Sequence, residues 1–311
     1  MSGDRLDLPQ LGGGTFITDG GMETTLIFHG GIDLPHFASF VLLDDEAGRD
    51  ALRDYYRPYI DIARANGVGI VIDTPTWRAN QDWGERLGYS PDALDQVNRR
   101  AVALLEELRD GAGEVTVVIS GCIGPRGDGY RADELMTIAE AERYHAPQVA
   151  TFAGTAADMI SALTLTYAEE AVGIARAAED RDTPVVISFT VETDGRLPSG
   201  QPLREAIEEV DAATDEAAAY FMVNCAHPTH FADVFEERGP WLGRVRGLRA
   251  NASAKSHAEL DEAEELDEGD PLALAESYRE LARRLPNLTV VGGCCGTDHR
   301  HIGAICEIST A

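Results

Sequence analysis

Lysine is almost absent from this chain: Lys255 is the single lysine among 311 residues, and arginine supplies the other cations. With 54 acidic and 26 basic residues, the formal net charge is −28. Such a surface repels nucleic acid and anionic membranes, so neither is expected as a partner. An acidic excess with so little lysine is typical of a halophilic protein, whose self-repulsion is screened by salt. Compositional drift in a GC-rich genome, which also favours arginine over lysine, is the alternative.

Long apolar runs are also lacking. No stretch approaches the ~20 apolar residues that a membrane helix requires. The amino-terminal segment MSGDRLDLPQLGGG has no cationic part followed by an apolar one, so it does not resemble a secretory signal. The cysteines number five, and an odd count argues for reduced thiols in metal or catalytic use over disulfides. A cytoplasmic location is therefore expected.

Short β-rich apolar runs alternate with helical stretches, which is the pattern of an α/β protein. Strands are predicted over Thr15–Asp19, Val68–Asp73, Val115–Gly121, Asp158–Leu163, Pro184–Thr190, Tyr220–Cys225, Val245–Ala250 and Leu288–Gly292. Helices are predicted over Arg49–Asn66, Asp92–Asp110, Asp133–Phe152, Tyr167–Ala178, Pro202–Ala213, Pro271–Arg284 and Arg300–Ile308. No repeat or linker divides the chain, so residues 1–311 are predicted to form one domain, a (β/α)8 TIM barrel. An open, doubly wound sheet is the alternative.

Chemistry in such a barrel collects on the loops after the carboxyl ends of the strands. Residues distant in the sequence would then converge at one mouth, among them Asp19, Asp73, Cys122, Asn224, Cys225, Cys294 and Cys295. The acidic stretch Glu259–Asp270 follows the seventh predicted strand and is expected to be a solvated loop or short helix.

A pair of adjacent cysteines, Cys294 and Cys295, ends the last predicted strand inside a glycine cluster. Neighbouring side chains on a regular strand point to opposite faces, so both can bind one ion only if the backbone leaves β geometry. The flanking glycines provide that freedom. Cys225, at the end of an earlier strand, can supply a third thiolate. Three thiolates leave one position of a tetrahedral zinc ion open, as in a catalytic site, and a substrate thiol could be activated there.

Other readings of these residue types stay open. A free cysteine is commonly a small buried hydrophobe. Cys122 is expected to serve packing, with a place near the site as the alternative, and Cys306 is expected in the core. His227 is a competing zinc ligand because it follows Cys225 closely, whereas His299 and His301 are expected to face away from the ion.

Several segments together resemble the homocysteine S-methyltransferase family over nearly the whole chain. This family includes the betaine and S-methylmethionine enzymes and the homocysteine domain of cobalamin-dependent methionine synthase. The zinc-binding signatures are matched by Asn224-Cys225 and by Gly292–Thr297. Further matches are Thr18–Met22, Ser120–Pro125, Ile187–Thr190 and Gly200–Leu203.

The resemblance implies a zinc-dependent (β/α)8 barrel. Position by position, it implies these zinc ligands: Cys225, Cys294 and Cys295. It places Asp19 and the backbone of Gly20 and Gly21 at the amino-acid end of homocysteine, with Asn224 supporting the site. A turn aspartate beside two glycines is the alternative for Asp19.

The chain departs from the family pattern where homocysteine would bind. Leu163 stands in place of an acidic residue of the fourth strand, and Thr74–Trp77 lacks the asparagine of the second-strand motif. Thr25 stands where many members have an acid. Either Glu23, Asp73 or Glu192 compensates for these losses, or the acceptor thiol is not homocysteine.

The function expected from these residues is zinc-dependent methyl transfer from a sulfonium or ammonium donor to homocysteine, giving methionine. The alternatives are the same chemistry on a different thiol or selenol, and a barrel that binds zinc or a thiol metabolite without turnover. The chain is too short to carry cobalamin and folate modules beside the barrel, so a corrinoid would have to come from a partner protein.

Overall fold

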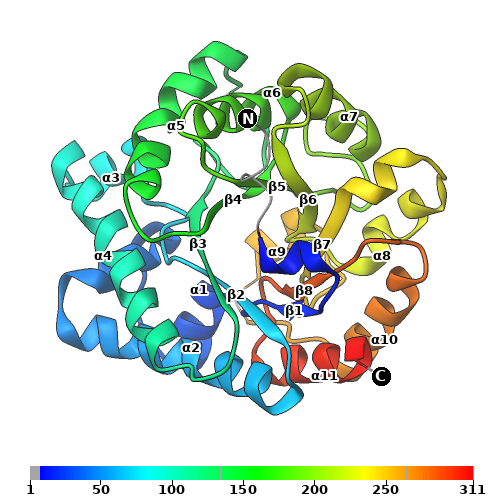
Figure 1. The fold of residues 1–311 in the computed structure, drawn as a ribbon, viewed down its shortest axis with the longest axis horizontal. Coiled ribbons are helices and arrows are strands. Elements are labelled where there is room, and N and C mark those ends of the chain that lie inside the picture. Colours follow the sequence, from blue (N-terminus) through cyan, green and yellow to red (C-terminus); the bar gives the residue numbers. More distant parts are fainter. Residues whose placement is uncertain (1–7, 134, 264, 311) are drawn as a thin grey trace.

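The structure is a computed structural model that describes residues 8–133, 135–263 and 265–310. Eight parallel strands pair in chain order, and β8 pairs with β1 to close a barrel that the helices surround (Figure 1). The predicted (β/α)8 barrel is confirmed, and the open-sheet alternative is wrong. The segment in which no secretory signal is expected begins outside the described residues, and a single domain over 1–311 stays a prediction.

Each predicted strand overlaps an observed strand. The strands are β1 Phe16–Ile17, β2 Gly69–Asp73, β3 Val117–Ile123, β4 Met159–Leu165, β5 Val185–Phe189, β6 Ala218–Asn224, β7 Val245–Ala250 and β8 Val290–Gly293. The helices are α1 Met22–Thr24, α2 Glu46–Asn66, α3 Gln81–Arg86, α4 Pro91–Asp110, α5 Ile138–Ala153, α6 Ala168–Glu179, α7 Leu203–Thr214, α8 Pro228–Phe231, α9 His257–Asp261, α10 Pro271–Ala282 and α11 His299–Thr310.

The start of α5 differs from the prediction, which placed it at Asp133. Thr137 caps the helix because its hydroxyl accepts from the backbone N–H of Glu140, while the Glu140 carboxylate accepts from the N–H of Thr137. This capping box fixes the first turn at Ile138. Residue 134, inside the predicted helix, lies outside the described residues. Three short helices, α1, α3 and α8, were not predicted, whereas α9 overlaps the acidic stretch in which a solvated loop or short helix was expected.

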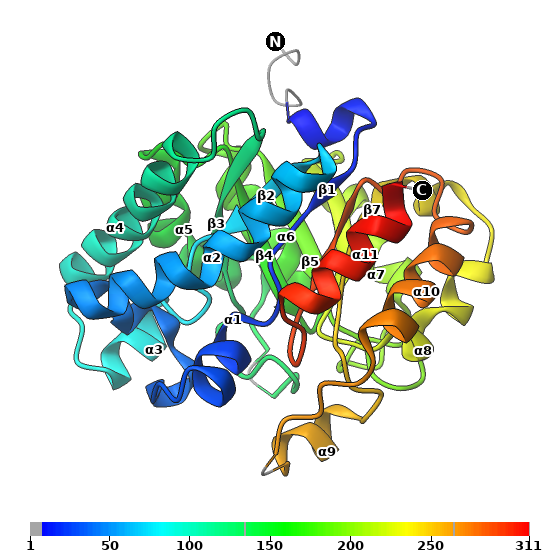
Figure 2. The same cartoon turned by 90° about the horizontal axis from the view of Figure 1, so that it is seen from below.

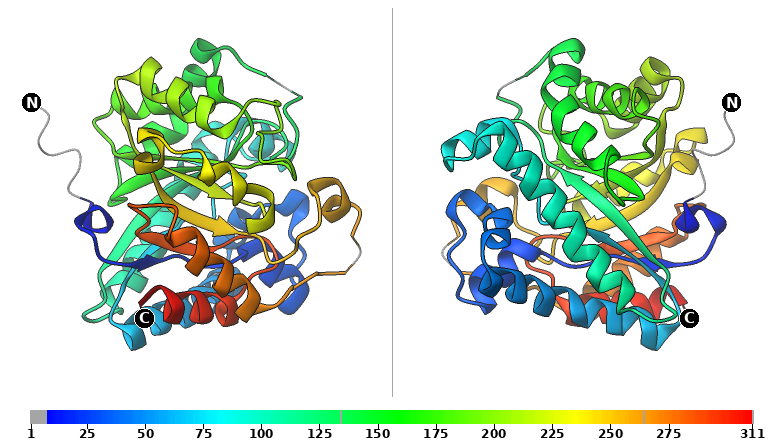
Figure 3. Two further views of the ribbon diagram at one scale, coloured as in Figure 1. Left: turned by 90° about the vertical axis from the view of Figure 1, so that its right-hand side faces the viewer. Right: turned by 60° about the vertical axis from the view of Figure 1, so that its left-hand side comes forward.

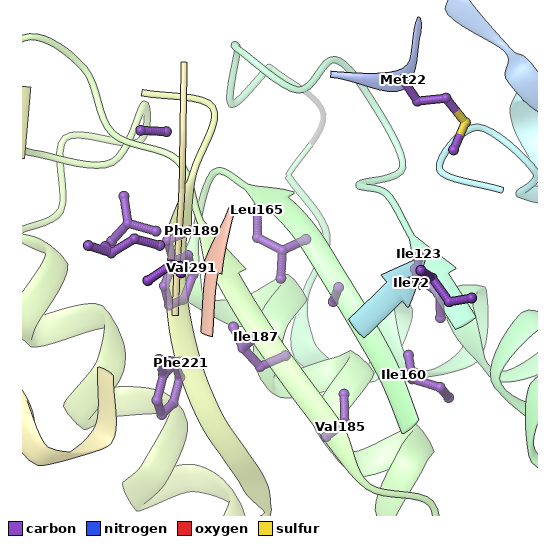
Figure 4. Close-up of a cluster of buried hydrophobic side chains, with 14 of the residues drawn as sticks. Met22, Ile72, Ile123, Ile160, Leu165, Val185, Ile187, Phe189, Phe221 and Val291 are labelled. Atoms are coloured by element: carbon purple, nitrogen blue, oxygen red, sulfur yellow. The ribbon is translucent and has the colours of Figure 1, made fainter. Parts of the chain in front are cut away.

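Two layers of apolar side chains follow from the alternation of neighbouring residues along each strand. On β5, Val185, Ile187 and Phe189 belong to the large cluster between strands and helices, part of which Figure 4 shows. Val186, between them, belongs to a smaller cluster inside the barrel. A few polar side chains also lie on the inner face, among them Ser120 and Ser161, whose hydroxyl oxygens are 2.7 Å apart. The polar residues at the carboxyl ends of the strands form the candidate site.

The two ends of the barrel differ in what closes them. The short helix Pro9–Gly12 lies at one end and α9 at the opposite end (Figures 2 and 3). At the amino-terminal end, Gln10 is fully buried and its amide nitrogen lies 3.4 Å from the hydroxyl of Tyr220. The opposite end of the barrel, where the strands finish, is therefore the end at which a ligand can bind. None of the described helices combines the length and apolar character needed to cross a bilayer.

Candidate functional site

Three cysteine sulfurs meet at the carboxyl end of the barrel. Cys225 directly follows β6, and Cys294 and Cys295 directly follow β8. The Cys225 Sγ lies 3.1 Å from Cys294 Sγ and 3.6 Å from Cys295 Sγ. The three sulfurs form a group compact enough to hold one metal ion. The structure thus brings together the three cysteines singled out in the sequence, while their binding of a metal stays a prediction.

Left-handed backbone conformations turn these cysteines toward one another. Cys225 has φ of 58°, which is uncommon for a residue other than glycine. Its carbonyl oxygen accepts from the Asn251 side-chain amide at 3.0 Å and lies 2.9 Å from Nε2 of His257. After the cysteine pair, Gly296 has φ of 78°. These contacts and this glycine hold a bend that a regular strand end would not make.

The thiols influence one another's ionisation. Hydrogen bonds with Cys225 and Cys295 hold the pKa of Cys294 well below its usual range. The contact with Cys294 raises the pKa of Cys225, and contacts with both neighbours raise that of Cys295. Ionisation of all three buried thiols therefore requires a nearby cation, which a bound metal would supply.

Tyr130 covers the sulfurs from the loop between β3 and α5. Its ring stacks on His257 with centroids 4.1 Å apart, and its hydroxyl lies 3.4 Å from Cys225 Sγ and 3.7 Å from Cys295 Sγ. The other ring nitrogen of His257 lies 3.1 Å from a carboxylate oxygen of Glu192. No sequence pattern indicates this arrangement, because Tyr130 lies beyond the β3 motif and His257 resembles an ordinary helix start.

Asn224 ties three strands together beside the cysteines. Its Oδ1 accepts from the backbone N–H of Thr164 at 2.9 Å and from Ser188 Oγ at 2.6 Å. Its Nδ2 donates to Thr164 Oγ1 and lies 3.9 Å from Cys294 Sγ. Thr164 has φ of 64°, and its two bonds to the amide hold that strained conformation. This geometry is compatible with the supporting role implied for Asn224.

A buried ion-pair network lies close to the cysteines. The guanidinium of Arg249 pairs with Asp19 at 2.5 Å and also with Asp73, and the Tyr55 hydroxyl donates to Asp19 at 3.0 Å. Burial raises the pKa of Asp19 to about 7, although Arg249 acts in the opposite direction. Both carboxylate oxygens of Asp19 thus have protein partners. Its predicted role at a substrate ammonium stays a prediction.

Gly20 and Gly21 pack against the loop that carries the cysteines. A Cβ atom at Gly21 would lie 2.6 Å from the carbonyl oxygen of Cys294, so only glycine fits there. The Gly21 N–H donates to Thr297 O at 2.9 Å and already has a partner. These glycines therefore position the cysteine loop, and their predicted contact with substrate stays a prediction.

A cavity of about 470 Å³ opens over the sulfurs. Its aromatic lining is Phe28, Phe37, Trp77 and Tyr130, and its acidic lining includes Glu23, Asp128, Asp261, Glu265 and Asp267. The acidic stretch Glu259–Asp270 supplies several of these residues, so the expectation of a solvated loop or short helix was incomplete. The short helix exists as the end of α9, but the stretch also forms a wall of the cavity. Residue 264 within it lies outside the described residues.

The remaining candidates lie apart from the three sulfurs. Cys122 is buried on the inner face of β3 and lines the cavity, and burial raises the pKa of its thiol. Cys306 is in the core, as expected. Nδ1 of His227 bonds to the Thr229 hydroxyl at 2.8 Å, and the cysteine group among the described residues does not include it. His301 is buried against Asp298.

Leu163 lines the same cavity and puts an apolar side chain where an acid was expected. Two further charged residues, Glu23 and Arg78, also line it. Glu23 was named as one possible compensating acid, whereas Arg78 was missed because an arginine after a predicted strand carries no distinctive signal.

A family model described as homocysteine S-methyltransferase matches residues 16–309. The chain belongs to this family. The resemblance found in the sequence is confirmed, and so is the prediction of a methyltransferase enzyme.

Solved structures of Escherichia coli homocysteine methyltransferase MmuM resemble this homocysteine S-methyltransferase family member in fold. The oxidised form is 20% identical with a TM-score of 0.73, and the match covers 94% of each chain. The metallated form is 19% identical with a TM-score of 0.73, covering 95% of this chain and 96% of the other. A comparison with curated proteins gives no match.

Proposed function

We propose that this protein is a zinc-dependent S-methyltransferase that moves a methyl group from a sulfonium or ammonium donor to homocysteine, giving methionine. The observation that carries the proposal is the group formed by Cys225, Cys294 and Cys295 at the floor of a cavity. Membership of the homocysteine S-methyltransferase family supports homocysteine as the acceptor.

The donor set fits a catalytic zinc ion. Sulfur ligands about 2.3 Å from a tetrahedral zinc lie about 3.8 Å apart. The sulfur of Cys225 lies 3.1 and 3.6 Å from the other two, so small side-chain movements suffice. Three cysteines leave a fourth position for a ligand, and the described part of the chain adds no histidine or carboxylate to this group.

A bound zinc ion would supply Lewis acidity that lowers the pKa of a coordinated thiol, so that a thiolate is available at neutral pH. The residues of this chain would do the rest. Asn224 and the bonded carbonyl of Cys225 hold the ligands in place. Tyr130 shields the sulfurs on one side and reduces access of water.

The cavity suits a cationic methyl donor. Asp128, Asp261 and Asp267 line it together with the aromatic rings of Trp77 and Tyr130. Acidic side chains attract a sulfonium or quaternary ammonium ion, and aromatic faces bind such ions through cation–π contacts. A corrinoid protein as methyl source is not indicated by any of these residues.

One observation favours a second candidate, in which the acceptor is a different thiol or a selenol. Leu163 presents an apolar surface to the cavity in place of the family's acid. An acceptor without an ammonium group would lose no binding energy when leucine takes the place of the acid.

Methionine formation tests the proposal. Zinc-loaded protein would be incubated with homocysteine and S-methylmethionine, betaine or S-adenosylmethionine, at low and high KCl because the net charge of −28 suggests salt dependence. At least one donor is expected to give zinc-dependent methionine. Zinc and thiol binding without product from any donor would contradict the proposal and favour a binding barrel.

A further inference from the structure

Recognition of the amino-acid end of homocysteine requires a carboxylate for its ammonium group and a donor for its carboxylate. In this chain the fourth-strand position is Leu163, and both oxygens of Asp19 are taken by Arg249 and Tyr55. An ammonium group beside these residues would lack a free charged partner, which is unfavourable in a half-buried site. The partner must come from elsewhere in the cavity.

Arg78 is a charged group in this cavity whose hydrogen bonds are incomplete. The residue is 8% exposed, and its guanidinium stacks between the rings of Trp77 and Trp83, at 4.3 and 3.9 Å from their centroids. Its Nη1 donates to Gly127 O at 2.8 Å, its Nε has no partner, and it forms no ion pair within the described residues. The two indoles fix the plane of the guanidinium, and a planar guanidinium of this kind is well suited to bind a carboxylate.

Glu23 is a carboxylate that lines the same cavity as the cysteines and can accept further hydrogen bonds. Its Oε1 accepts from Ser39 Oγ at 2.7 Å, and burial raises its pKa. It lies on α1, which contacts the cysteine loop through the N–H of Gly296 donating to Thr24 Oγ1 at 3.1 Å. An ammonium group placed next to Glu23 would stabilise its charged form.

Both side chains line the cavity over the sulfurs. The Ser39 hydroxyl that bonds to Glu23 also lies 3.3 Å from the carbonyl oxygen of Pro75, three residues before Arg78. Glu23 and Arg78 influence each other electrostatically but form no ion pair within the described residues. The cavity is thus lined by an anion and a cation that do not neutralise each other, and a zwitterionic ligand carries the complementary charge for each.

We propose that Glu23 and Arg78 form an amino-acid clamp, in which Glu23 binds the α-ammonium group and Arg78 the α-carboxylate of the acceptor. The inference rests on the proposed zinc-bound thiol acceptor and assigns its chemical class as an α-amino acid. Glu23 thus supplies the carboxylate that is missing at position 163.

Three thiols that differ only at the amino-acid end test the clamp: homocysteine, 4-sulfanylbutanoate without the ammonium group, and 3-aminopropane-1-thiol without the carboxylate. Binding to zinc-loaded protein would be measured by isothermal titration calorimetry. Wild type is expected to bind each analogue about 10- to 100-fold more weakly than homocysteine. Glu23→Gln should weaken the binding of homocysteine by a similar factor and leave the affinity for 4-sulfanylbutanoate within about twofold. Arg78→Gln should weaken the binding of homocysteine by a similar factor and leave the affinity for 3-aminopropane-1-thiol within about twofold.

Ratios within one variant cancel any loss of folded or zinc-loaded protein. Arg78→Lys keeps a cation and should regain part of the discrimination. Asp54→Asn and Arg57→Gln, on an exposed ion pair of α2, are the matched controls and should leave all three affinities unchanged. Equal binding of the three thiols by wild type, or equal weakening of all three in Glu23→Gln and Arg78→Gln, would overturn the clamp alone. Binding of no thiol would overturn the proposed function and the clamp with it.

Discussion

Replacing Cys294 by serine is expected to abolish stoichiometric zinc retention and to lower methyl transfer at least a thousandfold. Loss of a supporting residue around a metal typically costs about 10- to 100-fold, and loss of a ligand costs more. Zinc per chain after dialysis, followed by the rate of methionine formation, measures both effects.

Two other cysteines provide controls for that experiment. Cys306→Ala changes a core residue of α11 remote from the cavity and should keep both zinc and activity. Cys122→Ala should keep zinc, because Cys122 lies outside the group of three sulfurs. Wild-type zinc content in Cys294→Ser, or zinc loss in Cys122→Ala, would place the metal elsewhere.

Arg249→Met is expected to reduce the free energy of unfolding by about 3–5 kcal/mol. The reason is that Asp19 and Asp73, both buried, would lose the cation that they share. Methionine keeps much of the side-chain volume, so the loss reports the charge and not a cavity. Chemical denaturation followed by circular dichroism measures the change.

A double variant distinguishes the loss of the buried ion pair from other destabilising effects of the substitution. In a background of Asp73→Asn, the same Arg249→Met change should cost about 1–3 kcal/mol less, because one buried carboxylate is already gone. Arg57→Met removes an exposed ion pair and should alter stability by less than about 0.5 kcal/mol. An effect of Arg249→Met no larger than that of Arg57→Met would show that the network does not stabilise the fold.

The barrel and the meeting of its cysteines could be predicted from the sequence because both depend on local patterns. Apolar runs with intervening helices define eight strand–helix units, and closure of the sheet brings Cys225 next to Cys294 and Cys295 whatever the precise strand ends. The glycines around the pair allow the bend that the last strand requires. Strand boundaries were less accurate, since they depend on pairing with neighbours.

The charged partners in the site could not be predicted. The pairing of Arg249 with Asp19 joins residues from opposite ends of the chain, and no spacing rule indicates it. Tyr130 over the sulfurs and Arg78 between two indoles likewise depend on loop conformations set by tertiary contacts. The sequence therefore predicts the meeting of the three cysteines better than it predicts the charged and aromatic residues that surround them.

X-ray absorption at the zinc edge tests the central claim most directly. Zinc-loaded protein without substrate should show three sulfur ligands at about 2.3 Å. After addition of homocysteine the number should rise to four, because the acceptor thiol takes the remaining position. A sulfur count that stays at three with saturating homocysteine would contradict thiol activation by the metal. Nitrogen ligation in place of a sulfur would contradict the site formed by Cys225, Cys294 and Cys295.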